Sequence, residues 1–121
     1  MTLVDTSVWV DHFKRRNATL AALLDEGAVA THPFVIGEIA LGQRSRRDLI
    51  ALLAELPAVG VIAHDDVLTL VERRGLAGAG IGWVDAHLLA SAMVEHVPLW
   101  TLDRKLAATA GRLAVSWSAS S

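Results

Sequence analysis

The chain has 121 residues, 53% of them hydrophobic and 20% charged, and a formal net charge of −2 at pH 7. This length suits one compact domain with a real core, and the composition excludes a disordered chain and a strongly basic nucleic-acid binder. The absence of cysteine excludes disulfides, thiolate nucleophiles and cysteine-bound metals.

No targeting or membrane-spanning segment is apparent in the sequence. No apolar run reaches the roughly 20 residues of a membrane span. Charged residues follow the first apolar stretch too early for a signal peptide. We therefore expect a cytoplasmic protein, with residues 1–117 as one domain and residues 118–121 as a loose tail.

Short β-rich runs alternate with helical patterns along the chain. The predicted strands are residues 2–5, 28–31, 59–63, 98–102 and 114–117. Apolar spacing with glycine and proline end signals predicts helices at residues 8–14, 18–25, 33–41, 46–56, 64–75, 83–95 and 103–112. Apolar strands that alternate with helices are typical of an α/β fold with a parallel sheet covered on both faces. Such sheets bind ligands outside the carboxyl ends of their strands.

Four carboxylates stand out because each follows a strand or interrupts an apolar segment. Asp5 and Asp103 each end a predicted strand. Glu38 interrupts "PFVIGEIALG", and Asp85 lies near the start of the most hydrophobic predicted helix. Each has a structural alternative: a turn residue for Asp5, an ion pair with Arg44 or Arg47 for Glu38, a helix-dipole partner for Asp85, and a helix cap for Asp103.

The four acids together predict a metal site. Two of them emerge at the same edge of a parallel sheet, and burying unpaired like charges costs several kcal/mol each. A divalent cation would offset that cost, since Mg²⁺ binds one or two carboxylates together with waters and substrate phosphate. Four acids exceed one such site and could hold two ions, which would activate a water and stabilise charge on a phosphate.

The segments "VDTSVW", "GEIALG", "WVDAHLLASA" and "TLDRKL" resemble, in order and spacing, the acidic signatures of PIN-domain ribonucleases. The resemblance is closest to the bacterial VapC toxins of toxin–antitoxin pairs and covers Leu3 to Trp117. It implies a three-layer α/β/α fold with a central, mostly parallel sheet of about five strands. It also implies cleavage of cellular RNA, such as tRNA or rRNA, with Mg²⁺ or Mn²⁺.

The resemblance carries specific residues and partners with it. The implied partners are RNA, a VapB-like antitoxin that covers the active site, and a second copy of the chain, giving a homodimer and a heterotetramer or larger complex with antitoxin. Relatives often carry a further acid where this chain reads Arg104-Lys105-Leu106. The implied catalytic and metal-binding acids are Asp5, Glu38, Asp85 and Asp103, with Ser7 and Thr101 as supporting hydroxyls.

Basic and aromatic residues provide weaker candidates for RNA contacts. The predicted phosphate contacts are Lys14, Arg15, Arg16, Arg44, Arg46 and Arg47, whose alternative role is that of solvated helix ends. Core packing is favoured over base stacking for Trp9, Trp83, Trp100 and Trp117. His87 is predicted to be structural, and residues 78–82 are predicted to be a flexible connection rather than a phosphate loop.

Other functions remain open on the sequence alone. A housekeeping RNA-processing nuclease and a nuclease-dead RNA- or protein-binding module would share the fold. A signalling receiver is disfavoured because the acid pair Asp65-Asp66 follows the third predicted strand instead of the first. The apolar residues of segments 8–24 and 46–56 fit either an ordinary core or a groove for an antitoxin or a second copy.

Overall fold

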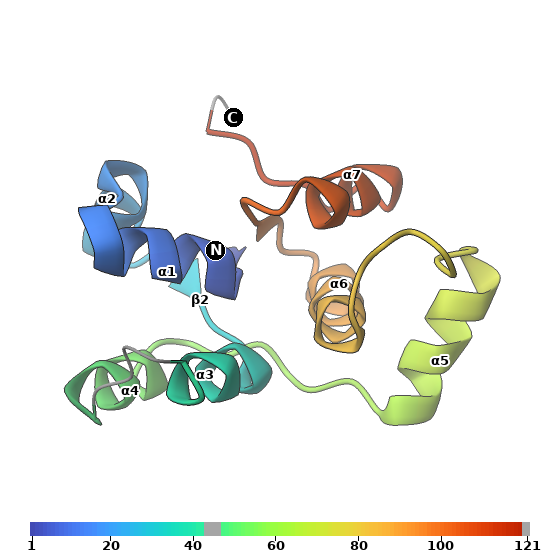
Figure 1. The fold of residues 1–121 in the computed structure, drawn as a ribbon, viewed down its shortest axis with the longest axis horizontal. Coiled ribbons are helices and arrows are strands. Elements are labelled where there is room, and N and C mark those ends of the chain that lie inside the picture. Colours follow the sequence, from blue (N-terminus) through green and yellow to red (C-terminus); the bar gives the residue numbers. More distant parts are fainter. Residues whose placement is uncertain (43–46, 120–121) are drawn as a thin grey trace.

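The computed structural model describes residues 1–42 and 47–119 of the chain. Helices surround a small sheet, and α4 and α5 lie toward opposite ends of the longest axis (Figure 1). In chain order the described elements are β1 (Thr2–Val4), α1 (Thr6–Arg15), α2 (Ala18–Asp25), β2 (Val29–Ala30), α3 (Pro33–Ala40), α4 (Arg47–Ala54), α5 (His64–Arg73), α6 (Trp83–Glu95), β3 (Leu99–Trp100) and α7 (Arg104–Arg112).

The sheet is parallel, with β1 between β2 and β3. Leu3 is paired with both Ala30 of β2 and Leu99 of β3. The side chains of Leu3 and Val4 are fully buried, as expected for strands that are covered on both faces. The predicted α/β class with a parallel sheet is therefore confirmed.

The number of strands differs from the prediction of about five. The described residues form three strands, and two further segments touch the sheet only through single parallel bridges, Thr31 to Ala58 and Leu99 to Ser116. The predicted strand at 59–63 is wrong because Gly60 turns toward α6. Its N–H donates to the Glu95 carboxylate, and its carbonyl accepts from Ser91 Oγ at 2.7 Å.

Most helix limits follow the sequence signals. Helix α6 spans residues 83–95 as predicted, and Gly27 follows α2 with a φ of +66°, a conformation that suits glycine. One difference is informative: α1 begins at Thr6 rather than Val8, and its N-cap is Asp5. No helix in the described part of the chain is long and apolar enough to cross a membrane.

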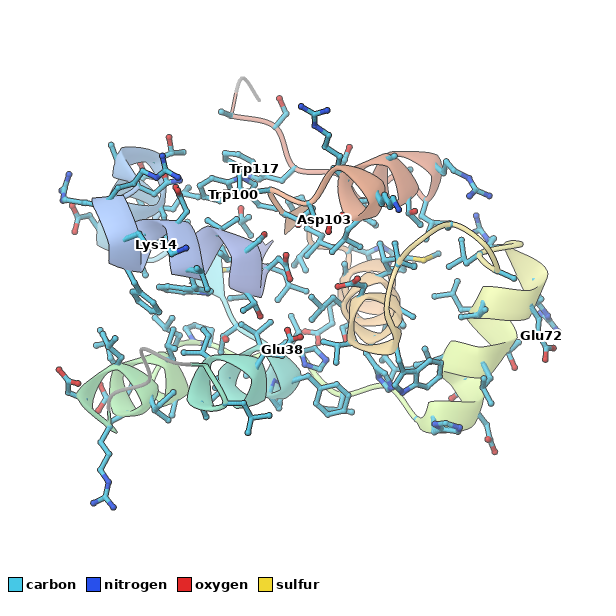
Figure 2. All side chains as sticks on the ribbon, in the orientation of Figure 1. Lys14, Glu38, Glu72, Trp100, Asp103 and Trp117 are labelled. Atoms are coloured by element: carbon cyan, nitrogen blue, oxygen red, sulfur yellow. The ribbon has the colours of Figure 1, made fainter. Side chains whose placement is uncertain are left out.

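The tryptophans divide into two kinds. Trp9 and Trp100 are buried, at 3% and 8% exposure. The ring of Trp100 stacks on that of Trp117, with centroids 4.2 Å apart. Figure 2 shows these two residues side by side. Core packing is therefore confirmed for Trp9 and Trp100, whereas Trp83 is 40% exposed at the start of α6 and does not follow that prediction.

Candidate active site

Asp5 lies at the carboxyl end of the central strand and is only 6% exposed. Its Oδ2 atom accepts hydrogen bonds from Ser7 Oγ at 2.7 Å and from Thr101 Oγ1 at 2.8 Å, and also from the Ser7 N–H at 3.4 Å. Among the described residues, none donates a hydrogen bond to Oδ1. Three donors therefore hold one oxygen of a buried carboxylate and leave its other oxygen available to a ligand.

The two hydroxyls connect Asp5 to the neighbouring strand end. Thr101 follows β3, and its Oγ1 accepts from the Asp103 N–H at 3.0 Å. Ser7 Oγ accepts from the Leu102 N–H, also at 3.0 Å. Each hydroxyl thus accepts from a backbone N–H and donates to Asp5. The predicted supporting residues Ser7 and Thr101 lie between the acids of two adjacent strands.

Asp103 and Asp85 each lie at the start of a helix, Asp103 as the N-cap of α7 and Asp85 in the first turn of α6. Asp103 caps α7, and its Oδ1 accepts from the Leu106 N–H at 3.0 Å. Asp85 is the third residue of α6, and its Oδ2 accepts from the Gly82 N–H at 2.9 Å. The structural alternatives for these two acids are therefore correct. They do not exclude a site, because each interaction uses one oxygen, and the positive end of a helix dipole helps to keep a carboxylate ionised.

Glu38 comes from α3 and is exposed. Its Oε1 accepts from Thr6 Oγ1 in α1 at 2.7 Å, a contact between residues that lie 32 positions apart. Figure 2 shows Glu38 between the ribbons of α3 and α6. Within the described residues Glu38 forms no ion pair, so the alternative pairing with Arg47 is wrong. Arg44, the other predicted partner, lies outside the described residues.

The acids influence one another electrostatically. The pKa of Asp85 is raised, mainly because burial penalises its charged form. The hydrogen bond from the Gly82 N–H opposes this shift, and the negative charges of Asp5 and Asp103 add to it. Asp85 is therefore close enough to Asp5 and Asp103 to be influenced by their charges at the edge of the sheet where β1 and β3 end.

The donor set fits a hydrated divalent ion better than a closed metal cage. Within residues 1–42 and 47–119, no three acidic or histidine side chains are close enough to enclose an ion by themselves. Yet each of the four acids has one oxygen that accepts a protein hydrogen bond and one that accepts none from the described residues. Mg²⁺ usually binds one or two carboxylates and keeps several waters, so this arrangement suits it.

Of the predicted phosphate contacts, Lys14 and Arg15 lie away from the four acids. Lys14 and Arg15 end α1, whose other end carries Asp5; Thr6 and Lys14 are separated by about 12 Å of helix axis. Arg15 forms an ion pair with Asp11 at 2.7 Å. The predicted contacts Arg44 and Arg46 lie outside the described residues.

Sequence reasoning missed two features of the site. The first is Thr6, the hydroxyl residue directly after the strand-end acid Asp5, which donates a hydrogen bond to Glu38. Arg104 and Lys105 are the basic residues adjacent to Asp103 in the chain, and both are exposed. The Lys105 side chain packs against Gly80, in the loop that leads to Asp85.

The predicted structural role of His87 agrees with its surroundings. It is 4% exposed, and its ring packs edge-on against Phe34 and Trp83. The acid pair Asp65 and Asp66 lies in the first turn of α5, at the exposed surface. This is not the strand-end position that a signalling receiver requires.

Comparison with known proteins identifies the family. Residues 2–112 match the PIN domain family, a range that contains all four acids. This chain belongs to the PIN-domain family. It is 47% identical over 118 residues to Ribonuclease VapC32 of Mycobacterium tuberculosis, from strain CDC 1551 / Oshkosh and from strain ATCC 25618 / H37Rv. Each alignment covers 96% of this chain and 95% of the relative. The chain is thus a VapC-like member of the family, and the resemblance predicted from its four motifs is confirmed.

Proposed function

We propose that this protein is the toxin of a toxin–antitoxin pair and that it cuts cellular RNA with a divalent metal bound by Asp5, Glu38, Asp85 and Asp103. Membership of the VapC-like ribonucleases supports the general activity, an endoribonuclease toxin. The metal, the residues that bind it, the RNA and the antitoxin are the parts that this proposal adds.

The observation that carries the proposal is the uncompensated charge at the strand ends. Burial and the charges of Asp5 and Asp103 raise the pKa of Asp85. Among the described residues, no basic side chain forms an ion pair with any of the four acids. A protein gains nothing in stability from such a cluster unless a cation joins it.

The chain's own residues divide the work of the site. Ser7 and Thr101 hold Asp5 in one orientation, so that its free oxygen points to a fixed position. When bound, a divalent ion supplies an acidified water and neutralises charge on the phosphate. Glu38 is exposed and held by Thr6 alone among the described residues. This makes it the acid best placed to orient an attacking water as a general base.

The acid cluster repels RNA until a cation neutralises it, so phosphate contacts must come from basic residues. Lys14, Arg15 and Arg16 form an exposed group at the end of α1. Charge reversal at Lys14 and Arg16 is expected to weaken RNA binding and to lower the slope of log K against log salt by about 2. An unchanged slope would remove this surface from the proposal.

The first test is cleavage of total bacterial RNA by the purified protein with Mg²⁺, with Mn²⁺ and with EDTA. The parent protein is compared with Asp5→Asn and with Asp25→Asn, a control that neutralises an exposed acid at the end of α2. We expect discrete metal-dependent fragments from the parent and the control, and a loss of at least about 100-fold in Asp5→Asn. The fragment ends would identify the RNA.

Other outcomes of the same test point to the alternative functions. Equal behaviour of the parent and Asp5→Asn with every metal would favour a nuclease-dead binding module. Cleavage that leaves bacterial growth unaffected would favour a housekeeping nuclease. Light scattering with and without the product of the neighbouring gene tests the proposed homodimer and the proposed complex with a VapB-like antitoxin.

A further inference from the structure

Glu38 and Asp85 lie on different helices, α3 and α6. Two hydroxyls connect the acids at the strand ends, but among the described residues no hydrogen bond or ion pair joins α3 to α6. Two buried histidines occupy the corresponding places on these helices. His32 caps α3, and His87 lies two positions after Asp85 in α6. These histidines are therefore candidates for residues that set the position of one helix acid relative to the other.

Several observations place His32 next to α6. The ring of Phe34 contacts both histidines, with its centroid 4.9 Å from that of His32 and 4.8 Å from that of His87. Residues His87, Ser91 and Glu95 follow one another at intervals of four and therefore share one face of α6. The first and last of these are the two residues whose charges influence the pKa of His32. His32 therefore faces the side of α6 that carries His87.

Each of the two histidines has a buried ring nitrogen without a partner among the described residues. His32 is fully buried, and His87 is 4% exposed. The atoms concerned are His32 Nε2 and His87 Nδ1. Leaving a buried donor or acceptor unpaired is costly, so buried polar groups nearly always have a partner in the protein or in ordered water. Two such atoms on elements that face each other indicate a shared partner.

The other ring nitrogen of His32 fixes its tautomer. Nδ1 accepts from the Phe34 N–H at 2.9 Å and therefore carries no proton. Burial lowers the pKa of His32 to about 4, so the ring is neutral at neutral pH and its one proton is on Nε2. An imidazole nitrogen binds a metal only without its proton. His32 Nε2 is therefore a hydrogen-bond donor, and its partner is an acceptor rather than a metal ion.

A water molecule fits the donors and acceptors around His32 Nε2. The two unpartnered nitrogens form no direct hydrogen bond with each other. Ser91 is fully buried one turn after His87, and its Oγ donates to the Gly60 carbonyl at 2.7 Å, which leaves its lone pairs to accept. A buried water usually makes about three hydrogen bonds. Here it has a donor in His32 and acceptors in His87 and Ser91.

We propose that one buried water accepts from His32 Nε2 and donates to His87 Nδ1, and that this bridge sets the separation of the acids of α3 and α6. The proposal rests on the metal site proposed above. His32 and His87 are then positioning residues: they touch neither the metal nor the RNA, and they act through Glu38 and Asp85. The bridge does for the helix acids what the two hydroxyls do for the acids at the strand ends.

The first experiment compares two substitutions of His87 with opposite properties. His87→Phe keeps an aromatic ring against Phe34 and Trp83 but has no acceptor. His87→Asn loses the ring but keeps an oxygen near the position of Nδ1. Mg²⁺ affinity is measured by calorimetry, below the unfolding transition of each protein. We expect binding to be about 10-fold weaker in His87→Phe and changed by less than about 2-fold in His87→Asn. If ring packing alone held α3 in place, the order would be reversed.

NMR of the parent tests the bridge without any substitution. Nitrogen chemical shifts should show a proton on Nε2 of His32 and none on Nδ1 of His87. The Nε2 proton of His32 should exchange slowly with solvent and show a cross-peak to a bound water. This exchange should become faster in His87→Phe. The matched control is His64→Phe, the same substitution at the exposed histidine that also contacts Trp83. It should change neither the exchange nor the Mg²⁺ affinity.

The outcomes keep this proposal separate from the proposed function. A proton on Nδ1 of His32, or rapid exchange of its Nε2 proton, overturns the bridge and leaves the metal site intact. Equal Mg²⁺ affinity in the parent and His87→Phe overturns the positioning role, and so does binding that is as weak in His87→Asn as in His87→Phe. A parent that binds no Mg²⁺ overturns the metal site itself, and the positioning role with it.

Discussion

Burial acts in opposite directions on two groups of ionisable side chains near the start of α6. At the acid cluster, burial raises the pKa of Asp85, and the charges of Asp5 and Asp103 raise it further. The rings of His64, Trp83, His87 and Phe34 form a contiguous series, the ring series, and the His32 ring contacts Phe34. Burial lowers the pKa of His32 to about 4, with a smaller lowering by His87 and a small opposing effect of Glu95. The pKa of His87 is lowered by burial and by His64. The charged form of Asp85 is thus disfavoured, and burial favours the neutral forms of His32 and His87.

The two groups also differ in their hydrogen bonds: the acids accept several, whereas two buried histidine nitrogens have no partner among the described residues. Two hydroxyls and a backbone N–H donate to Asp5, and a backbone N–H donates to each of Asp85 and Asp103. In contrast, the buried His32 Nε2 and His87 Nδ1 atoms have no partner among the described residues. The carboxylates are held ready for a cation, whereas the imidazoles are packed as rings.

The largest expected effect is that of Asp85→Asn. Asparagine can still accept the Gly82 N–H but removes a charge that burial and two neighbouring acids disfavour. Without metal, the free energy of unfolding at neutral pH should therefore rise. Cleavage should fall by at least about 100-fold, because a metal ligand is lost.

Chemical denaturation with and without Mg²⁺ checks this prediction. Since the pKa of Asp85 is raised above its ordinary value of 3.8, the folded state binds the proton more tightly than the unfolded state does. The parent therefore loses stability as pH rises from 3.8 through the raised pKa of the folded state. Mg²⁺ should restore stability to the parent more than to Asp85→Asn. An Asp85→Asn protein that is less stable without metal, and equally active, would mean that Asp85 only caps α6.

The next effect tests the histidine side of the comparison. His32 caps α3, and its Nδ1 accepts from the Phe34 N–H at 2.9 Å. Its folded pKa of about 4 lies below the ordinary 6.5, so the unfolded state binds the proton more tightly. The stability that neutral His32 contributes to the folded state is fully present above pH 6.5. Up to about 3 kcal/mol of it is lost as pH falls toward 4.

His32→Asn tests the effect of His32 protonation apart from its role as the N-cap of α3. Asparagine is a good N-cap residue and does not titrate in this range. The variant should therefore lose less stability than the parent between pH 6.5 and 4, as measured by urea unfolding at a series of pH values. Parallel curves for the two proteins would show that His32 contributes nothing to acid sensitivity.

The sequence predicts the acid cluster better than the ring series. Asp5, Glu38, Asp85 and Asp103 are visible because a charge in an apolar segment is conspicuous wherever the chain folds. Asp5 and Asp103 also end neighbouring parallel strands, so topology alone brings them to one edge. The contact of Thr6 with Glu38 needs α1 and α3 to pack side by side, and no local pattern indicates that packing.

The ring series combines residues of three helices, and its members look like ordinary core residues in the sequence. The same limitation explains the wrong strand at 59–63. Its apolar run suits a strand, but the partners of Gly60 are Glu95 and Ser91 in α6, more than thirty positions away. Local sequence patterns therefore identify helices, strands and unusual charges. Contacts with helices that are distant in the sequence decide whether a predicted strand forms.

A smaller effect tests whether the Thr101 hydroxyl is needed to orient Asp5. Thr101→Val removes the donor to Asp5 and the acceptor for the Asp103 N–H while keeping the side-chain shape. The expected cost is about 2 kcal/mol of unfolding free energy, with weaker Mg²⁺ binding because Asp5 is less well oriented. Thr101→Ser keeps the hydroxyl and should restore most of both losses. If valine and serine behaved alike, the hydroxyl would be dispensable and Asp5 would be oriented by packing.

The smallest effect concerns the loop that precedes α6. Gly80 has a φ of +79°, and a Cβ there would lie 2.6 Å from Lys105 Cδ, whereas Gly78 has a φ of +78° with nothing within 4 Å. Gly78→Ala therefore measures backbone strain alone, about 1 kcal/mol. Gly80→Ala should cost only slightly more by thermal unfolding, because the flexible Lys105 stem can move. Lys105 is not among the groups that shift the pKa of Asp85, so Mg²⁺ affinity should be equal in the two variants. A change of Mg²⁺ affinity in Gly80→Ala alone would mean that Lys105 already balances part of the negative charge of the acids. The acid cluster would then differ less from the neutral histidine rings in its uncompensated charge.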